Sequence, residues 1–166
     1  MEITARAFLF DEDERILLVK HAAGQPWVLP GGHLDEDDEG DIYTCLKREI
    51  AEEVGLEVTI IGSETKFSDR NVSALPLPVS IHRVKYEHRN RGEIERIEYW
   101  FFGRVFGDID EIDTAELYDF TWATEAEIMD MEENVEIYKS IQYLLDFFPS
   151  NSVYRSNTPP LDSIVF

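Results

Sequence analysis

The chain has 166 residues, 43% of them hydrophobic, which is the size and composition of one globular domain with its own core. Its formal charge of −20 excludes a protein that holds bulk nucleic acid on a basic surface, because phosphate binding relies on Lys and Arg. The sequence has no run of about 18 apolar residues, so we expect no membrane-spanning helix.

The N-terminal third predicts a hairpin followed by a glycine turn. Strands are expected over residues 3–10 and 15–20, joined by a polar turn over residues 11–14. After a break at residues 23–26, a short strand is expected to start at Trp27 and to end in the turn formed by two glycines, Gly31 and Gly32.

A helix is predicted from Asp41 to Val54. Asp41 suits the N-cap position, and Gly55 stands where a left-handed residue commonly ends a helix. Apolar side chains recur at spacings of three and four and define one buried face: Tyr43, Leu46, Ile50 and Val54.

The second half of the chain predicts four more strands and two helices. The strands are expected over residues 58–61, 79–86, 97–106 and 120–123. A proline-bearing loop or sheet edge over residues 72–78 and a polar turn over residues 88–95 separate them. Thr124 is expected to cap a helix from Glu125, and a second helix is expected over residues 136–147, ended by Pro149.

These elements predict a single domain over residues 1–149. Residues 150–166 are polar and proline-bearing, with an apolar end, and are predicted as a C-terminal segment outside the domain. That segment is either a loose tail or an arm that docks on a partner subunit.

The strongest chemical signal lies in the helix, between Arg48 and Leu56. At 100° per residue, Glu49, Glu52 and Glu53 fall within an arc of about 100°, beside the apolar face. Three carboxylates on one rigid helix suit a hard divalent cation such as Mg²⁺. The alternative, judged from the helix alone, is an ordinary solvated acidic surface.

The context of that helix resembles the Nudix hydrolase family. The turn Leu29-Pro30-Gly31-Gly32 precedes Arg48-Glu49-Ile50-x-Glu52-Glu53-x-Gly55-Leu56, and this second half of the family's signature matches at every specified position. The resemblance implies an α/β fold, the Nudix-type α/β/α sandwich with a mixed central sheet. It also implies a pyrophosphohydrolase that cleaves a diphosphate linkage in a nucleoside diphosphate derivative.

The first half of the signature departs from the family, because the loop after Gly32 is two residues longer than the pattern. Counting forward from Gly32 puts the family's loop glutamate at Asp38, and counting back from Arg48 puts it at Gly40. Glu39 lies between them, and we assign it as the loop glutamate, with Asp38 as the open alternative. Otherwise this acidic stretch is a solvated loop.

By motif position, the resemblance implies a Mg²⁺ or Mn²⁺ ion held by the carbonyl of Gly32 and by Glu49, Glu52 and Glu53. Arg48 is expected to orient these glutamates. The acid that accepts the proton of the attacking water is either a glutamate of the helix, Glu52 or Glu53, or one on a more distant strand, with Glu98 and Glu95 as candidates. The alternative for both is a solvated surface acid.

Substrate binding is expected from basic and aromatic residues. The segment 83–96 carries five basic side chains, among which Arg83 and Lys85 are our candidates for holding phosphate. The alternative is a charged hairpin tip balanced by its own glutamates. Trp27 and Trp100 are candidates for stacking on a base, with a place in the core as the alternative; His33 is a further candidate for phosphate contact.

Two other functions compete with hydrolysis: a non-catalytic module that senses a nucleotide, and a related metal-dependent isomerase. The intact glutamates of the helix count against the sensor. The expected partner is a small-molecule nucleotide, with no nucleic acid and no membrane, and a homodimer is common in the family. The single cysteine, Cys45, and the absence of a signal-peptide pattern at the start predict a cytoplasmic protein.

Overall fold

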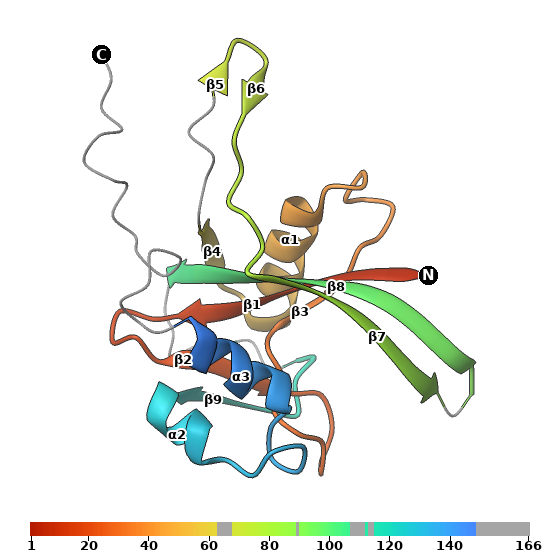
Figure 1. Cartoon of the computed structure of the whole chain (residues 1–166), viewed down its shortest axis with the longest axis vertical. Coiled ribbons are helices and arrows are strands. Elements are labelled where there is room, and N and C mark those ends of the chain that lie inside the picture. The colour runs from red at the N-terminus through yellow and green to blue at the C-terminus, as the bar shows by residue number, and fades with distance from the viewer. Residues whose placement is uncertain (63–67, 89, 107–111, 113–114, 149–166) are drawn as a thin grey trace.

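A computed structural model describes residues 1–62, 68–88, 90–106, 112 and 115–148 (Figure 1). In this part of the chain, seven strands form one sheet: β1 (Glu2–Phe10), β2 (Ile16–Lys20), β3 (Gly31–His33), β4 (Glu57–Ile61), β7 (Ser80–His88), β8 (Gly92–Phe106) and β9 (Asp119–Ala123). Two short strands, β5 (Ser68–Asp69) and β6 (Val72–Ser73), pair with each other. The helices are α1 (Ile42–Val54), α2 (Glu125–Asp130) and α3 (Lys139–Phe147).

The sheet is mixed and is organised around β1 and β8, which run parallel to each other from Glu2↔Arg96 to Phe10↔Arg104. The other edge of β8 is shared, because this 15-residue strand pairs with β7 along its first half and with β4 along its last residues. β1 pairs on its other edge with β3 and β2, and β9 follows β2. Gly31 and Gly32, which we expected to form a turn, are strand residues of β3. These two glycines, called the glycine turn below after the sequence motif, therefore lie beside β1, the central strand of the sheet.

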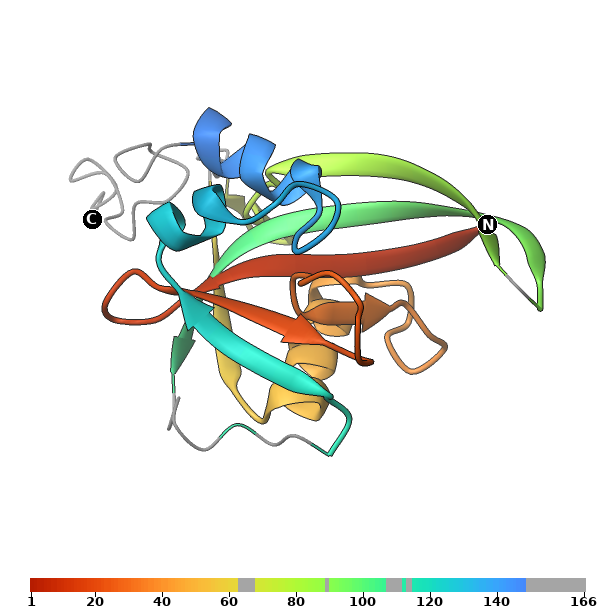
Figure 2. The ribbon, with the colours of Figure 1, turned by 90° about the horizontal axis from the view of Figure 1, so that it is seen from below.

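Helices cover both faces of this sheet, with α1 on one side and α2 and α3 on the other (Figure 2). Alternate side chains of β1 serve the two cores: Ala7 and Leu9 pack beneath α1, whereas Phe8 and Phe10 pack beneath α2 and α3. The arrangement is the predicted α/β/α sandwich with a mixed sheet.

Helix α1 forms for the local reasons that the sequence indicates. The Asp41 carboxylate accepts a hydrogen bond from the Tyr43 N–H (3.0 Å), and Gly55 ends the helix with a φ of 69°. Leu46, Ile50 and Val54 are fully buried against the sheet. Each contributes roughly 1.5–3 kcal/mol through removal of apolar surface from water.

Several predicted boundaries are wrong, and three of them matter most for the site. β8 begins at Gly92, so the second half of the predicted turn at residues 88–95 is strand. The short strand is Gly31–His33; Trp27 and Val28 form only isolated bridges. Helix α3 begins at Lys139 rather than 136, because the backbone of Glu136 bonds to Glu132 and Trp27 instead of starting a helix.

Pro149 and the predicted segment 150–166 lie outside the described residues, so the proposed division of the chain stays a prediction. Of the helices that the structure describes, none combines the length and the apolar character that a membrane span needs.

Candidate active site

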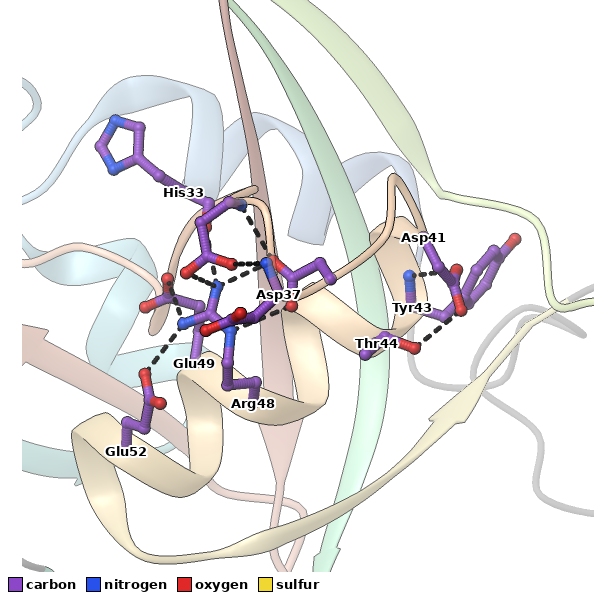
Figure 3. Close-up of polar contacts among 10 residues, drawn as sticks. His33, Asp37, Asp41, Tyr43, Thr44, Arg48, Glu49 and Glu52 are labelled. Carbon is purple, nitrogen blue, oxygen red and sulfur yellow. Dashed lines mark hydrogen bonds and ion pairs between the residues drawn. The ribbon is translucent and has the colours of Figure 1, made fainter.

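Arg48 is the centre of a charged network on α1 and on the loop before it (Figure 3). Its guanidinium donates from Nε and Nη2 to the two carboxylate oxygens of Asp38, at 2.9 and 2.8 Å. Its Nη1 donates to Glu52 at 2.8 Å and lies 3.1 Å from a carboxylate oxygen of Glu49. Nη2 also reaches the His33 carbonyl and the Asp35 carboxylate. One guanidinium thus serves four carboxylates.

Asp38 makes the contact that we expected from Glu39. Its side chain is 0% exposed, and hydrogen bonding to Arg48 lowers its pKa to about 2. Glu39 is exposed, has a φ of 51°, and is not among the four carboxylates that contact Arg48. Asp38, the position reached by counting forward from Gly32, therefore ties the loop to the helix.

Glu49 lies directly against the glycine turn. A Cβ atom at Gly32 would sit 2.1 Å from the Oε2 atom of Glu49, so a side chain at this position would displace the carboxylate from where it lies. Glu49 and Gly32, two of the predicted metal ligands, are therefore adjacent. Glu52, the third, is more exposed and points to Arg48.

Glu53 is the buried member of the set, with a side chain 6% exposed. It accepts a hydrogen bond from the Gly31 N–H at 2.9 Å, and the Nε2 atom of His21 lies 3.3 Å from its other oxygen. Burial raises the pKa of Glu53 to about 7, against the lowering effect of the Gly31 hydrogen bond. Burial likewise lowers the pKa of His21.

The predicted metal ligands lie close to one another but do not converge. Within the described residues, no three His, Cys, Asp or Glu side chains are placed to hold a metal ion. Glu49 and Glu52 turn towards Arg48, whereas Glu53 turns towards Gly31 and His21. The set is all oxygen, which matches a hard divalent cation in kind.

A cleft of about 440 Å³ opens on the face of the sheet that carries α3. Its described lining includes aromatic and apolar side chains of the sheet and residues of α3. The arginine, histidine and carboxylate side chains of that lining are Arg6, His21, Arg96 and Glu98. Glu98 is buried in the cleft wall, where it accepts a hydrogen bond from Trp100 Nε1 at 3.0 Å and pairs with Arg96. A volume of this order suits a nucleoside-sized ligand.

Arg6 connects the cleft with the glycine turn. Its Nη1 donates to the Leu29 carbonyl at 2.7 Å and lies 3.5 Å from the Gly31 carbonyl, while its Nε lies 4.0 Å from Glu98. Burial lowers the pKa of Arg6, Glu98 raises it and Arg96 lowers it. We did not single out Arg6 or His21 from the sequence. The sequence does offer one indication for Arg6, because it is the charged residue of the mostly apolar strand predicted over residues 3–10.

The other predicted substrate contacts lie outside this cleft. Arg83 and Lys85 are exposed, and both pair with Glu95. Because side chains alternate along β7, they project from the opposite face to Val84 and Tyr86, which line the cleft. Arg83 and Lys85 therefore do not line this cleft, and their assignment as phosphate contacts stays a prediction. Glu95, which pairs with both, is a partly exposed acid.

Of the two tryptophans, only Trp100 belongs to the described lining of the cleft, although it is largely buried. Trp27 is half-buried and carries Lys20 over its ring at 4.2 Å. His33 is exposed and lies 3.3 Å from Glu2.

Comparison with known proteins agrees with this architecture. The family model described as "NUDIX domain" matches residues 2–144. A NUDIX-family hydrolase from Clostridium perfringens is 19% identical, with a TM-score of 0.62 over 87% of this chain and 96% of that one. The NUDIX domain of Shewanella oneidensis NrtR, complexed with ADP ribose, is 16% identical, with a TM-score of 0.54 over 87% and 86%.

Among curated relatives, the m7GpppN-mRNA hydrolase of Saccharomyces cerevisiae is 29% identical over 105 residues. The match spans 60% of this chain but only 11% of the length of that relative. Similarity at this level to the solved structures establishes the fold alone. Family membership rests on the family model, which matches residues 2–144.

Proposed function

The chain belongs to the Nudix family of pyrophosphohydrolases, and from this premise we propose that it cleaves a diphosphate linkage in a nucleoside diphosphate derivative with the help of Mg²⁺ or Mn²⁺. The observation that carries the proposal is the excess of carboxylates around Arg48, one of which, Glu49, lies against Gly32. A hard cation would balance that charge.

Three glutamates of α1 would hold the ion, together with the Gly32 carbonyl: Glu49, Glu52 and Glu53. Their oxygen donors fit Mg²⁺ and Mn²⁺ in kind, and Glu49 already lies against Gly32. When bound, such an ion would neutralise phosphate charge and lower the pKa of a coordinated water. Arg48 keeps Glu49 and Glu52 on one side of the helix, and the Gly31 N–H orients Glu53.

Glu53 is our candidate for the acid that accepts the proton of the attacking water. In the protein without a metal ion, burial raises the pKa of Glu53, and a raised pKa strengthens a carboxylate as a base. Glu98 is less suited to this role, because Trp100 and Arg96 already bind its carboxylate in the cleft wall. We therefore assign Glu98 to the substrate cleft instead.

The substrate class follows from the family and from the cleft. An aromatic wall that includes Tyr86 and Trp100 suits the flat base of a small nucleotide. The ligand of the Shewanella NUDIX domain, ADP ribose, is itself a nucleoside diphosphate derivative. The yeast relative acts on m7GpppN-mRNA by name, so a capped oligonucleotide belongs among the substrates to be tested.

A non-catalytic nucleotide sensor is the second candidate. It is favoured by one observation: in the described part of the chain, the acidic side chains of α1 do not converge as metal ligands. In that case the cleft would bind a nucleotide without turning it over.

The test is phosphate or nucleotide release from a panel with and without Mg²⁺ or Mn²⁺. The panel contains ADP-ribose, nucleoside triphosphates, a sugar nucleotide, a dinucleoside polyphosphate and a capped oligonucleotide. Glu53→Gln should reduce metal-dependent turnover at least about 100-fold. Glu12→Gln, an exposed glutamate of the β1–β2 turn, serves as the matched control and should leave turnover unchanged.

Full activity of Glu53→Gln would overturn the assignment of α1 as the catalytic helix. Tight nucleotide binding without turnover across the whole panel would favour the sensor.

A further inference from the structure

The cleft carries an excess of positive charge in a chain whose overall formal charge is −20. Among its described lining residues, Arg6 and Arg96 are cationic and Glu98 alone is anionic. All three side chains are largely buried, with exposed fractions of 14%, 19% and 5%. Two guanidiniums therefore share one carboxylate in a site with restricted access to water.

The contacts of these three groups leave hydrogen-bonding capacity unused. The Nε atom of Arg96 is buried and has no hydrogen-bond partner, although its Nη2 pairs with Glu98. Arg6 reaches the same Glu98 oxygen only at 4.0 Å. A buried donor without a partner is unfavourable, so an incoming group with several acceptor oxygens would improve this arrangement.

We propose that Arg6 and Arg96 form a receptor for a phosphate group of the substrate, and that Glu98 occupies this receptor when the cleft is empty. The proposal rests on the proposed function and deepens it by naming the residues that select an anionic ligand. Guanidinium groups present paired N–H donors that match phosphate oxygens. Glu98 is a positioning residue here, since it acts by holding the two arginines.

The geometry favours a phosphate group, and not the edge of a base, as the part of the ligand that Arg6 and Arg96 bind. Trp100 Nε1 donates to one oxygen of Glu98, and the other forms ion pairs with Arg96 and Arg6, so the charge that is left unbalanced in the cleft is positive and suits an anionic group better than an uncharged base. The guanidinium of Arg96 lies 5.2 Å over the ring of Tyr86, which fixes its plane beside the aromatic wall. Arg6 is fixed by the Leu29 carbonyl.

Calorimetric titration of the full chain in EDTA tests the proposal, because it removes any contribution of a metal ion to phosphate binding. The ligands are inorganic pyrophosphate, ADP and adenosine. Arg96→Met should weaken pyrophosphate and ADP binding at least about tenfold. Arg91→Met, an exposed arginine at the tip of the same hairpin that pairs with Glu2, should stay within about twofold of wild type.

Glu98→Gln gives the sharper result. Its amide oxygen can still accept from Trp100, but it no longer competes with phosphate for the two arginines, so pyrophosphate binding should tighten about threefold or more. Arg96→Lys is the companion variant in case Arg96→Met does not fold; it keeps the charge, loses the paired donors and should still weaken binding.

Weaker pyrophosphate binding by Glu98→Gln, or no pyrophosphate binding by either wild type or Glu98→Gln, would overturn the proposal. So would binding of pyrophosphate without ADP, since the site would then take free phosphate and not substrate. Loss of adenosine affinity alone in Arg96→Met would mean that the cleft reads the base. The titrations involve neither metal nor turnover, so their failure is distinct from failure in the hydrolysis assay.

Discussion

The two Arg–carboxylate networks of this molecule have opposite charge balances. On α1 and the loop before it, Arg48 serves four carboxylates, and negative charge is in excess. In the cleft, Arg6 and Arg96 share Glu98, and positive charge is in excess. The first region calls for a cation and the second for an anion. A phosphate group that carries a metal ion would satisfy both at once, with Arg6 between them beside the glycine turn.

The two networks also differ in how the chain builds them. The network of Arg48 comes from one short stretch of the chain, residues 35–52, which forms a loop and a helix. The cleft network joins β1 to β8, which pair only because the sheet brings distant segments together. We expect substitutions in the Arg48 network to change stability most, because its Asp38 is buried, and substitutions in the cleft network to change ligand binding most.

The largest effect is expected when the single cation of the first network is removed. Arg48→Met would leave Asp38 as a buried carboxylate without its partner, which typically costs about 3–5 kcal/mol. The free energy of unfolding, measured by urea denaturation, should fall by about 3 kcal/mol. Arg91→Met, an exposed arginine, is the control and should change it by less than about 0.5 kcal/mol. A loss below about 1 kcal/mol in Arg48→Met would show that this network is not structural.

The next effect separates neighbouring residues of the acidic loop. Asp38→Asn should lower the free energy of unfolding by about 2 kcal/mol, because an amide cannot accept both Arg48 hydrogen bonds. Glu39→Gln, on the exposed residue beside it, should cost less than about 0.5 kcal/mol. Thermal and urea unfolding of both variants measure this difference. If Glu39→Gln cost as much as Asp38→Asn, the loop would be anchored differently from the structure.

The elements that the sequence predicted best are those whose signals are local. The cap at Asp41, the left-handed Gly55 and the helical spacing of apolar residues gave α1 within one residue at its start. The start of β8 was missed because Glu93 and Glu95 alternate with Ile94 on a two-sided strand, and a charged alternation of this kind is easily taken for a turn.

In the candidate site, too, local contacts can be predicted from the sequence, whereas contacts between distant segments cannot. The spacing of Arg48 and Glu52 along α1 predicts their contact, because residues four apart lie on one face of a helix. The ion pair of Arg48 with the adjacent Glu49 does not follow from that spacing. Counting alone left Asp38 and Glu39 open, since an insertion can be placed at either end of the loop. The meeting of Arg6 with Glu98 depends on the parallel pairing of β1 with β8, and no spacing in the sequence indicates it.

A smaller effect distinguishes the first network by its response to pH. The folded-state pKa of Asp38, about 2, lies below its ordinary value of 3.8, so the unfolded chain binds the proton more readily. The stabilisation from Asp38 is therefore complete above about pH 4 and is lost as the pH falls towards 2, a change of about 1–2 kcal/mol. The difference in unfolding free energy between wild type and Asp38→Asn should shrink from pH 6 to pH 2.5. A constant difference would mean that the Asp38 charge does not contribute.

The smallest effect is expected on the face of the sheet opposite the cleft. Arg83 is exposed, pairs with Glu95, and projects away from Val84 and Tyr86, although its sequence position within a basic segment resembles that of Arg96. Arg83→Met should therefore change the KM for the best substrate less than about twofold, because an exposed pair of this kind contributes little. Steady-state kinetics with Arg96→Met as the comparison measure this. A fivefold or greater rise in KM for Arg83→Met would mean that the substrate extends onto the opposite face of the sheet. Substrate binding would then not depend on the charges of the cleft alone.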